Sequence, residues 1–169
     1  MAVLKWFHKI SEWLDYVCGG LCVVCVAAMV LLTGAQIACR VWFTALAWSE
    51  ELTRYLMVWA TFLGASCVYR RMGHINVTII RDLFPHSCRV AMQVVCHLLC
   101  AAFFIAAVVY GIDYMGMQSR QLSAALRIPM SYVYLAIPIG CGIMAFHVVD
   151  LLLQMLPQTR SGKDAEGAA

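Results

Sequence analysis

The sequence predicts an all-α membrane protein with four transmembrane helices. Of its 169 residues, 63% are hydrophobic and only 12% are charged. Four long apolar stretches contain no Asp, Glu, Lys or Arg, and these are residues 16–39, 55–69, 90–112 and 128–149. The hydrocarbon core of a bilayer needs about 20 apolar residues per helix. Three stretches reach that length, and the second reaches it when it is extended back to Trp48, with the Arg54 side chain reaching toward the headgroups.

Charge and motifs narrow the functional classes. The formal net charge of +3 is spread along the chain, which argues against nucleic-acid binding. A stand-alone ion-coupled carrier normally keeps an ionisable residue at membrane depth, and the four apolar stretches hold none of Asp, Glu, Lys or Arg. The sequence has no recognisable catalytic triad, zinc-ligand set or phosphate-binding loop. We therefore predict no enzyme activity, no cofactor and no metal.

The first predicted span, residues 16–39, is preceded by a segment with helical periodicity at residues 3–15. Its apolar and charged residues occupy different faces, which predicts an amphipathic interfacial helix or a simple extension of the span. The apolar stretch is too long for the h-region of a signal peptide, so we expect the span to be retained. Cys22 and Cys25 form a C-x-x-C pair. Because eight of the nine cysteines lie in apolar stretches, we predict helix packing rather than redox chemistry.

The second predicted span covers residues 48–69 and begins with polar residues. Ser49 suits the N-cap of this helix, and Glu50 and Glu51 suit the positive end of its dipole. Arg54 lies four residues after Glu50 and three after Glu51, which predicts a local ion pair.

Arg70 and Arg71 end the second span, and residues 74–84 follow. The apolar residues of this segment form one stripe, which predicts a short helix lying in the membrane surface. A strand also fits their alternation, but a lone strand there would leave its backbone unpaired. The third predicted span covers residues 90–112 and the fourth covers residues 128–149.

Two prolines mark the fourth span. Pro129 is predicted in its first turn, where a missing N–H costs nothing, and Pro138 is expected to kink the helix. A single membrane domain is predicted over residues 1–156. The small and polar residues 157–169 are predicted to form a disordered cytoplasmic tail.

Lys and Arg are divided unequally between the two sides of the predicted bundle. Eight lie in the N-terminal segment, the loop between the second and third spans, and the C-terminal tail, whereas four lie in the other two loops. The positive-inside rule then predicts that both termini are cytoplasmic.

Small residues recur at a spacing of four on two of the spans. Ala60 and Gly64 form one such pair, and Ala136 and Gly140 form the other. Such pairs let helix backbones approach closely, either within this chain or against a partner.

Two histidines, His97 and His147, lie in the third and fourth spans. Facing histidines in a four-helix membrane bundle can ligate a haem. Their depths along the two helices match poorly. Single histidines in membrane helices also more often hydrogen-bond a neighbour. A haem-binding electron-transfer subunit is therefore the alternative hypothesis.

The order of residues over 48–77 resembles the small, DctQ-like membrane subunit of tripartite ATP-independent periplasmic (TRAP) transporters. That family's pattern has a glutamate pair, an arginine, a tryptophan, a Leu-Gly-Ala sequence, a basic residue and a His-Ile pair in this order. A second similar segment covers residues 123–129 and is followed by Tyr134 and Pro138.

This resemblance implies a non-catalytic subunit of the bacterial inner membrane. It implies a stable complex with a large membrane subunit that couples solute uptake to sodium, contact with lipids, and transient contact with a periplasmic binding protein that delivers a carboxylate-type solute. The candidate structural and partner-interface residues are Glu50, Glu51, Arg54, Trp59, Ala60, Gly64, Arg70, Arg71, His74, Arg120, Ser123, Arg127, Pro129, Ala136, Pro138 and Gly140.

Overall fold

The described part of the chain is almost entirely helical. The computed structural model describes residues 2–42, 46–72 and 86–166. This part contains no strand, only an isolated antiparallel bridge between Leu122 and Pro129. Its helices are α1 (Ala2–Trp42), α2 (Ala47–Met72), α4 (His86–Met117), the 3₁₀ helix η1 (Gln118–Arg120), α5 (Ser131–Tyr134) and α6 (Ala136–Glu166). The predicted all-α fold is confirmed.

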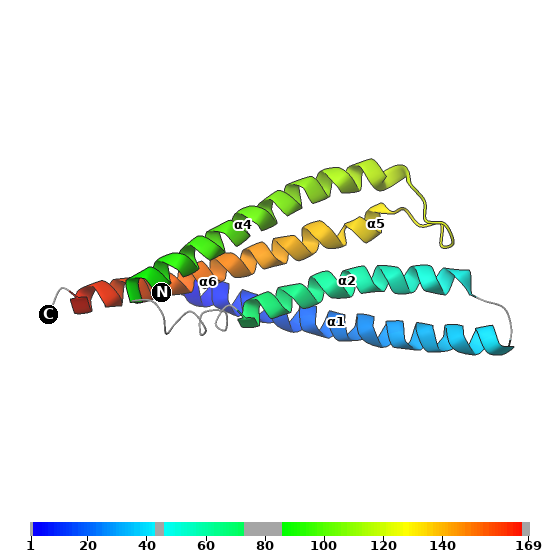
Figure 1. Ribbon diagram of the computed structural model, residues 1–169, viewed down its shortest axis with the longest axis horizontal. Helices are drawn as coiled ribbons and strands as arrows, with labels where there is room; N and C mark the ends of the chain where they lie inside the picture. Colours follow the sequence, from blue (N-terminus) through cyan, green and yellow to red (C-terminus); the bar gives the residue numbers. More distant parts are fainter. Residues whose placement is uncertain (1, 43–45, 73–85, 167–169) are drawn as a thin grey trace.

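The helices form two long antiparallel hairpins (Figure 1). α1 packs along α2, α4 packs along α5 and α6, and contacts between α2 and α6 join the two hairpins. The start of α1 and the end of α6 lie together at what we call the terminal end of the bundle. The end of α1, the start of α2 and the connection from α4 to α5 lie at the opposite end, which we call the loop end.

Three of the four predicted spans are long and apolar enough to cross a membrane. They cover Trp6–Trp42, Met92–Arg120 and Ser131–Leu153. α2 has 26 residues, and a helix of that length rises about 39 Å, but charged residues lie near both of its ends. The second predicted span, which corresponds to α2, therefore stays a prediction.

Each hairpin contains one buried cluster of side chains between its helices. The cluster between α4 and α6 consists of Phe104, Cys141, Met144 and Val148. The cluster between α1 and α2 consists of Cys18, Leu63 and Cys67. All the described cysteines are free thiols, and three of them belong to these clusters. The positions of these three cysteines agree with the predicted packing role.

α1 is unbroken, which favours the simple extension of the span over an interfacial helix at residues 3–15. Contacts with α6 explain why the segment continues the span. The ring of Phe7 stacks on that of Phe146 with centroids 5.4 Å apart, and Ser11 Oγ lies 2.9 Å from His147 Nδ1. The structure has the simple extension that the sequence left open.

The fourth span is interrupted as Pro138 predicts. α5 ends at Tyr134 and α6 begins at Ala136, because Pro138 has no N–H to donate to the carbonyl of Tyr134, four residues earlier. The predicted position of Pro129 in the first turn of a helix is wrong. Pro129 precedes α5 and pairs with Leu122 in the bridge, so its backbone is extended there.

A further difference lies at the end of α6. α6 continues to Glu166, so residues 157–166 are helical where the sequence predicts a disordered tail. Extending an existing helix needs no new nucleus, and Gln, Arg, Lys, Ala and Glu in this segment are good helix formers. The predicted interfacial helix at residues 74–84, with the candidate residue His74, lies outside the described residues.

Candidate functional site: the two ends of the helix bundle

At the loop end, the connection between η1 and α5 folds into a tight turn. The Ser123 N–H donates to the Ile128 carbonyl at 2.9 Å, and the Met130 N–H donates to the Gln121 carbonyl at 2.9 Å. Arg127 has φ 55, a left-handed conformation that non-glycine residues adopt only when their surroundings enforce it. A turn of this kind can direct several successive N–H groups to one side and form an anion-binding nest.

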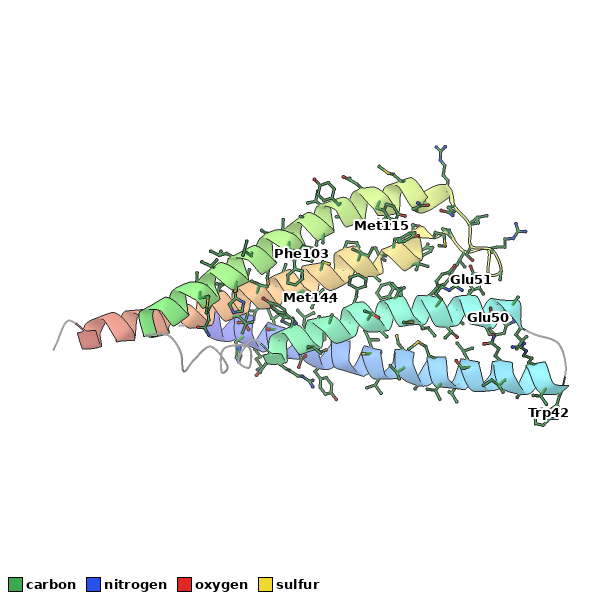
Figure 2. All side chains as sticks on the ribbon, in the orientation of Figure 1. Trp42, Glu50, Glu51, Phe103, Met115 and Met144 are labelled. Carbon is green, nitrogen blue, oxygen red and sulfur yellow. The ribbon has the colours of Figure 1, made fainter. Side chains whose placement is uncertain are left out.

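Glu51 of α2 occupies this nest. Its carboxylate accepts the backbone N–H groups of Ala124 at 3.1 Å, Ala125 at 2.8 Å and Leu126 at 2.9 Å, and it also accepts the hydroxyl of Tyr55. Figure 2 shows Glu51 pointing from α2 toward the loop. Hydrogen bonds to an ionised acceptor are stronger than neutral ones. Glu51 therefore ties the second hairpin to the first at the loop end.

An open cleft of about 710 Å³ lies beside this contact, lined by residues of α2 and of the loop that include Arg54 and Gln121. Glu50 turns the other way and accepts a hydrogen bond from Gln36 of α1 at 2.9 Å. The predicted ion pair between Arg54 and Glu50 or Glu51 does not form among the described residues. The nest and Gln36 take the two carboxylates, and the Arg54 side chain stays exposed.

The beginning of α2 differs from the prediction in one detail. The helix starts at Ala47, so Ser49 lies inside it and is not the N-cap. The Ser49 hydroxyl donates to the Leu46 carbonyl at 2.8 Å, a local bond that competes with capping.

Other predicted site residues of the loop end lie close to this nest. Ser123 is 4% exposed and begins the turn that presents the nest. Arg120 and Arg127 are exposed at either side of the turn. The structure thus brings Glu51, Ser123 and Arg127 together, which sequence spacing alone could not indicate.

The small-residue pairs lie in helix contacts within this chain. A Cβ added at Gly140 would lie 2.7 Å from the Cβ of Phe62 on α2, and one added at Gly64 would lie 3.5 Å from Cys22 Sγ on α1. Ala60 and Ala136 are buried beside them. Of the two interpretations that the sequence allowed, these contacts favour internal packing.

Trp59 also lies on the inner side of α2. It packs against the cluster of Cys18, Leu63 and Cys67. Its position therefore favours a contribution to the α1–α2 contact.

At the terminal end, two arginines of α2 bind carboxylates of α1. Arg70 lies 3.8 Å from Glu12 and 3.8 Å from Asp15, with only 16% of its side chain exposed. Arg71 lies 3.4 Å from Asp15, but 69% of its side chain is exposed. Both predicted residues therefore anchor α2 to α1.

A buried polar group beside these pairs was missed by the sequence reasoning. Ser11 and His147 are 0% exposed and share a hydrogen bond, and Asp150 is 3% exposed and lies 3.3 Å from His8 Nδ1. The spacing of these residues in the sequence could have indicated the contact between α1 and α6. His8 and Ser11 on α1, and His147 and Asp150 on α6, are each three residues apart, so each pair lies on one helix face. We call Ser11, Asp15, Arg70, His147 and Asp150 the terminal-end cluster.

The two histidines considered as haem ligands have separate partners. His97 Nδ1 lies 3.1 Å from the Tyr69 hydroxyl, whereas His147 is bonded to Ser11. Among the described residues, no group of three or more His, Cys, Asp or Glu side chains is placed to hold a metal ion.

Long apolar helices with charged side chains gathered at the two ends define an integral membrane protein of several spans. The chain belongs to the family described as tripartite ATP-independent periplasmic transporters, DctQ component, whose profile matches residues 29–158. It is a TRAP transporter small permease of the inner membrane. The family match gives no support to the haem alternative.

Three relatives illustrate the match. The chain is 26% identical to the sialic acid TRAP transporter permease protein SiaT of Haemophilus influenzae, over 87% of this chain and 23% of SiaT. It is 23% identical to the sialic acid TRAP transporter small permease protein SiaQ of Vibrio cholerae, over 64% of this chain and 63% of SiaQ. It is 24% identical to the C4-dicarboxylate TRAP transporter small permease protein DctQ of Vibrio cholerae, over 90% of this chain and 76% of that protein.

Proposed function

We propose that this chain is a non-catalytic scaffold subunit of a TRAP transporter. It binds stably to a large membrane subunit, which performs the sodium-coupled uptake of a carboxylate-type solute. A periplasmic binding protein delivers that solute to the complex.

The distribution of charge carries this proposal. The described Asp, Glu, Lys and Arg side chains all lie outside the stretches 16–39, 55–69, 90–112 and 128–149. At the ends, carboxylates of α1 and α2 are engaged by Arg70, Arg71, Gln36 and the nest. A carrier that bound ions and a charged solute by itself would need such groups at membrane depth.

The exposed apolar surface supports the scaffold role. Only 6% of the most apolar window of α1 and 11% of that of α4 is buried within the chain, compared with 44% for the α5–α6 span. Phe103 of α4, for example, is 67% exposed. These faces are available to lipid tails and to the helices of a large subunit.

The relatives support the partnership and the solute class. This chain matches only 23% of SiaT, so SiaT carries a small-permease-like part within a much longer permease chain. SiaT and SiaQ are named for sialic acid and the Vibrio DctQ for C4-dicarboxylates. Both solutes contain carboxylates, and we extend that class to this chain.

We further propose that α2 also crosses the membrane, which gives four spans, and that both termini are cytoplasmic. The excess of Lys and Arg on the terminal side supports this orientation. The loop end, with the exposed Arg54, Arg120 and Arg127, then faces the periplasm where the binding protein arrives.

Solute uptake tests this function. Native cells and cells lacking this chain are compared for accumulation of labelled dicarboxylates and sugar acids, with and without a sodium gradient. We expect one carboxylate whose sodium-dependent uptake is lost in the deletion and restored by the chain. Uptake that is unchanged for every solute, in cells that retain the large subunit, would contradict the scaffold role.

A further inference from the structure

We infer that the terminal-end cluster binds one ordered water molecule between His147 Nε2 of α6 and Asp15 Oδ1 of α1. This inference depends on the described contacts of this chain alone and is independent of the proposed function.

Two buried polar atoms mark the site. His147 Nε2 and Asp15 Oδ1 each expose less than 1 Å² and have no hydrogen-bond partner among the described residues. The other polar atom of each side chain is engaged, since His147 Nδ1 lies 2.9 Å from Ser11 Oγ and Asp15 Oδ2 pairs with Arg70 and Arg71. Buried polar atoms of native proteins are almost always paired with protein or with ordered water.

The two atoms belong to one neighbourhood. Ser11 and Asp15 are four residues apart and lie on the same face of α1, and Ser11 contacts His147 directly. Asp15, Asp150 and Arg70 all act electrostatically on His147. The imidazole therefore sits among the carboxylates of α1 and α6 and the guanidinium of α2.

Water fits this site better than a cation. A water molecule can donate to the Asp15 carboxylate, and it can either donate to or accept from His147, so the bridge forms with either imidazole tautomer. A hard cation such as sodium prefers several oxygen ligands. The guanidinium of Arg70, 3.8 Å from Asp15 Oδ2, already supplies the positive charge and disfavours a second one.

The bound water gives the cluster a structural task. It completes a polar contact between α1 and α6 next to the ion pairs of α2. Three helices from both hairpins then share one network, which fixes the leading segment of α1 against α6. A fully satisfied buried network of this kind favours a single packing arrangement.

The test is a pair of electron cryo-microscopy maps of the full chain, purified from native membranes with its bound partners, at a resolution that shows ordered water. One sample is kept in sodium chloride and the other in choline chloride. We expect the same density peak in both maps, at a hydrogen-bonding distance of about 2.7–3.2 Å from both atoms. A peak that appears only in sodium would identify a cation site and overturn the inference. If neither map shows a peak, the inference is overturned too.

Two histidine variants provide the matched control. His147→Phe removes one partner of the bridge, and we expect the peak to be lost. His97→Phe removes the other histidine of the spans, whose bond is to Tyr69, and we expect the peak to remain. A peak that persists in His147→Phe would contradict the assignment of His147 as its partner. If His147→Phe does not assemble, the two maps of the unaltered chain still decide the question.

Discussion

Replacing Gly140 by alanine is predicted to push α6 away from α2. The new Cβ would lie 2.7 Å from the Cβ of Phe62, 3.0 Å from its Cδ1 and 3.1 Å from its Cγ. Carbon atoms pack best at about 3.5–4.0 Å. The ring of Phe62 can rotate, but its Cβ is fixed to the backbone of α2. The clash is therefore relieved only when the two helices separate by about 1 Å, given that preferred spacing.

Gly142 on the same helix supplies the matched control, because a Cβ added there meets no atom within 4 Å. Both substitutions gain about 1 kcal/mol of helix propensity, so that gain cancels in the comparison. Overpacking a well-packed contact costs about 1–3 kcal/mol. Each kcal/mol lowers Tm by about 2–4 °C in a protein of this size. Gly140→Ala should therefore unfold about 2–12 °C below Gly142→Ala by these two relations.

The assay is thermal unfolding of the two purified full-length variants in the same detergent, followed by intrinsic fluorescence and by size-exclusion recovery after heating. Equal Tm values for the two variants would show that α6 does not approach α2 at Gly140, and would refute the packing of the two hairpins described here.

Gly64 gives a graded check on the contact between α1 and α2. A Cβ there lies 3.5 Å from Cys22 Sγ, so alanine fits and Gly64→Leu should lower Tm and reduce the yield of complex. An unchanged yield with Gly64→Leu would remove this position from the tight contacts.

Two further substitution pairs test the ends of the bundle. Glu51→Gln replaces one of the two carboxylate oxygens that accept the N–H groups of the nest by an NH₂ group, so proteolysis within residues 121–130 should become severalfold faster. Glu50→Gln should leave the rate of proteolysis unchanged. Equal rates for the two variants would show that Glu51 does not hold the loop. Arg70→Gln should cost about 1–3 kcal/mol because the Arg70 side chain is only 16% exposed and contacts both Glu12 and Asp15. Arg71→Gln should cost at most about 1 kcal/mol, because the Arg71 side chain is 69% exposed. Thermal unfolding ranks the two, and a larger loss with Arg71→Gln would contradict the burial described for this end.

The apolar helices were predictable because membrane insertion is a property of each segment by itself. A stretch of about 20 residues without charge is sufficient to predict a span, and the break near Pro138 follows from its missing N–H. The antiparallel arrangement of the long helices then places both chain ends together. These features need no knowledge of which helices touch.

The polar contacts were harder to predict because they join residues distant in the sequence. Glu51 meets Ala124, Ala125 and Leu126 only because α2 packs beside the second hairpin. Sequence spacing therefore suggested the local partner Arg54 instead. Likewise, Ser11 and His147 are separated by 136 positions, so the continuous α1 could not be distinguished from an interfacial helix.

The small-residue pairs show a second limit of sequence reasoning. Spacing at i, i+4 predicts a close approach of two helices, but it does not identify the approaching helix. The neighbours of Gly64 and Gly140 are Cys22 and Phe62 of the same chain. In the proposed complex, the face toward the large subunit is therefore sought on the exposed sides of α1 and α4.

The scaffold role is tested most directly by purifying the tagged chain from native membranes in mild detergent and identifying by mass spectrometry what accompanies it. We predict recovery of a large polytopic membrane protein in about equal molar amount, and its continued presence after washing at high salt. Recovery of the chain alone, or with redox proteins and a coloured cofactor, would contradict its assignment as the small subunit of a transport complex.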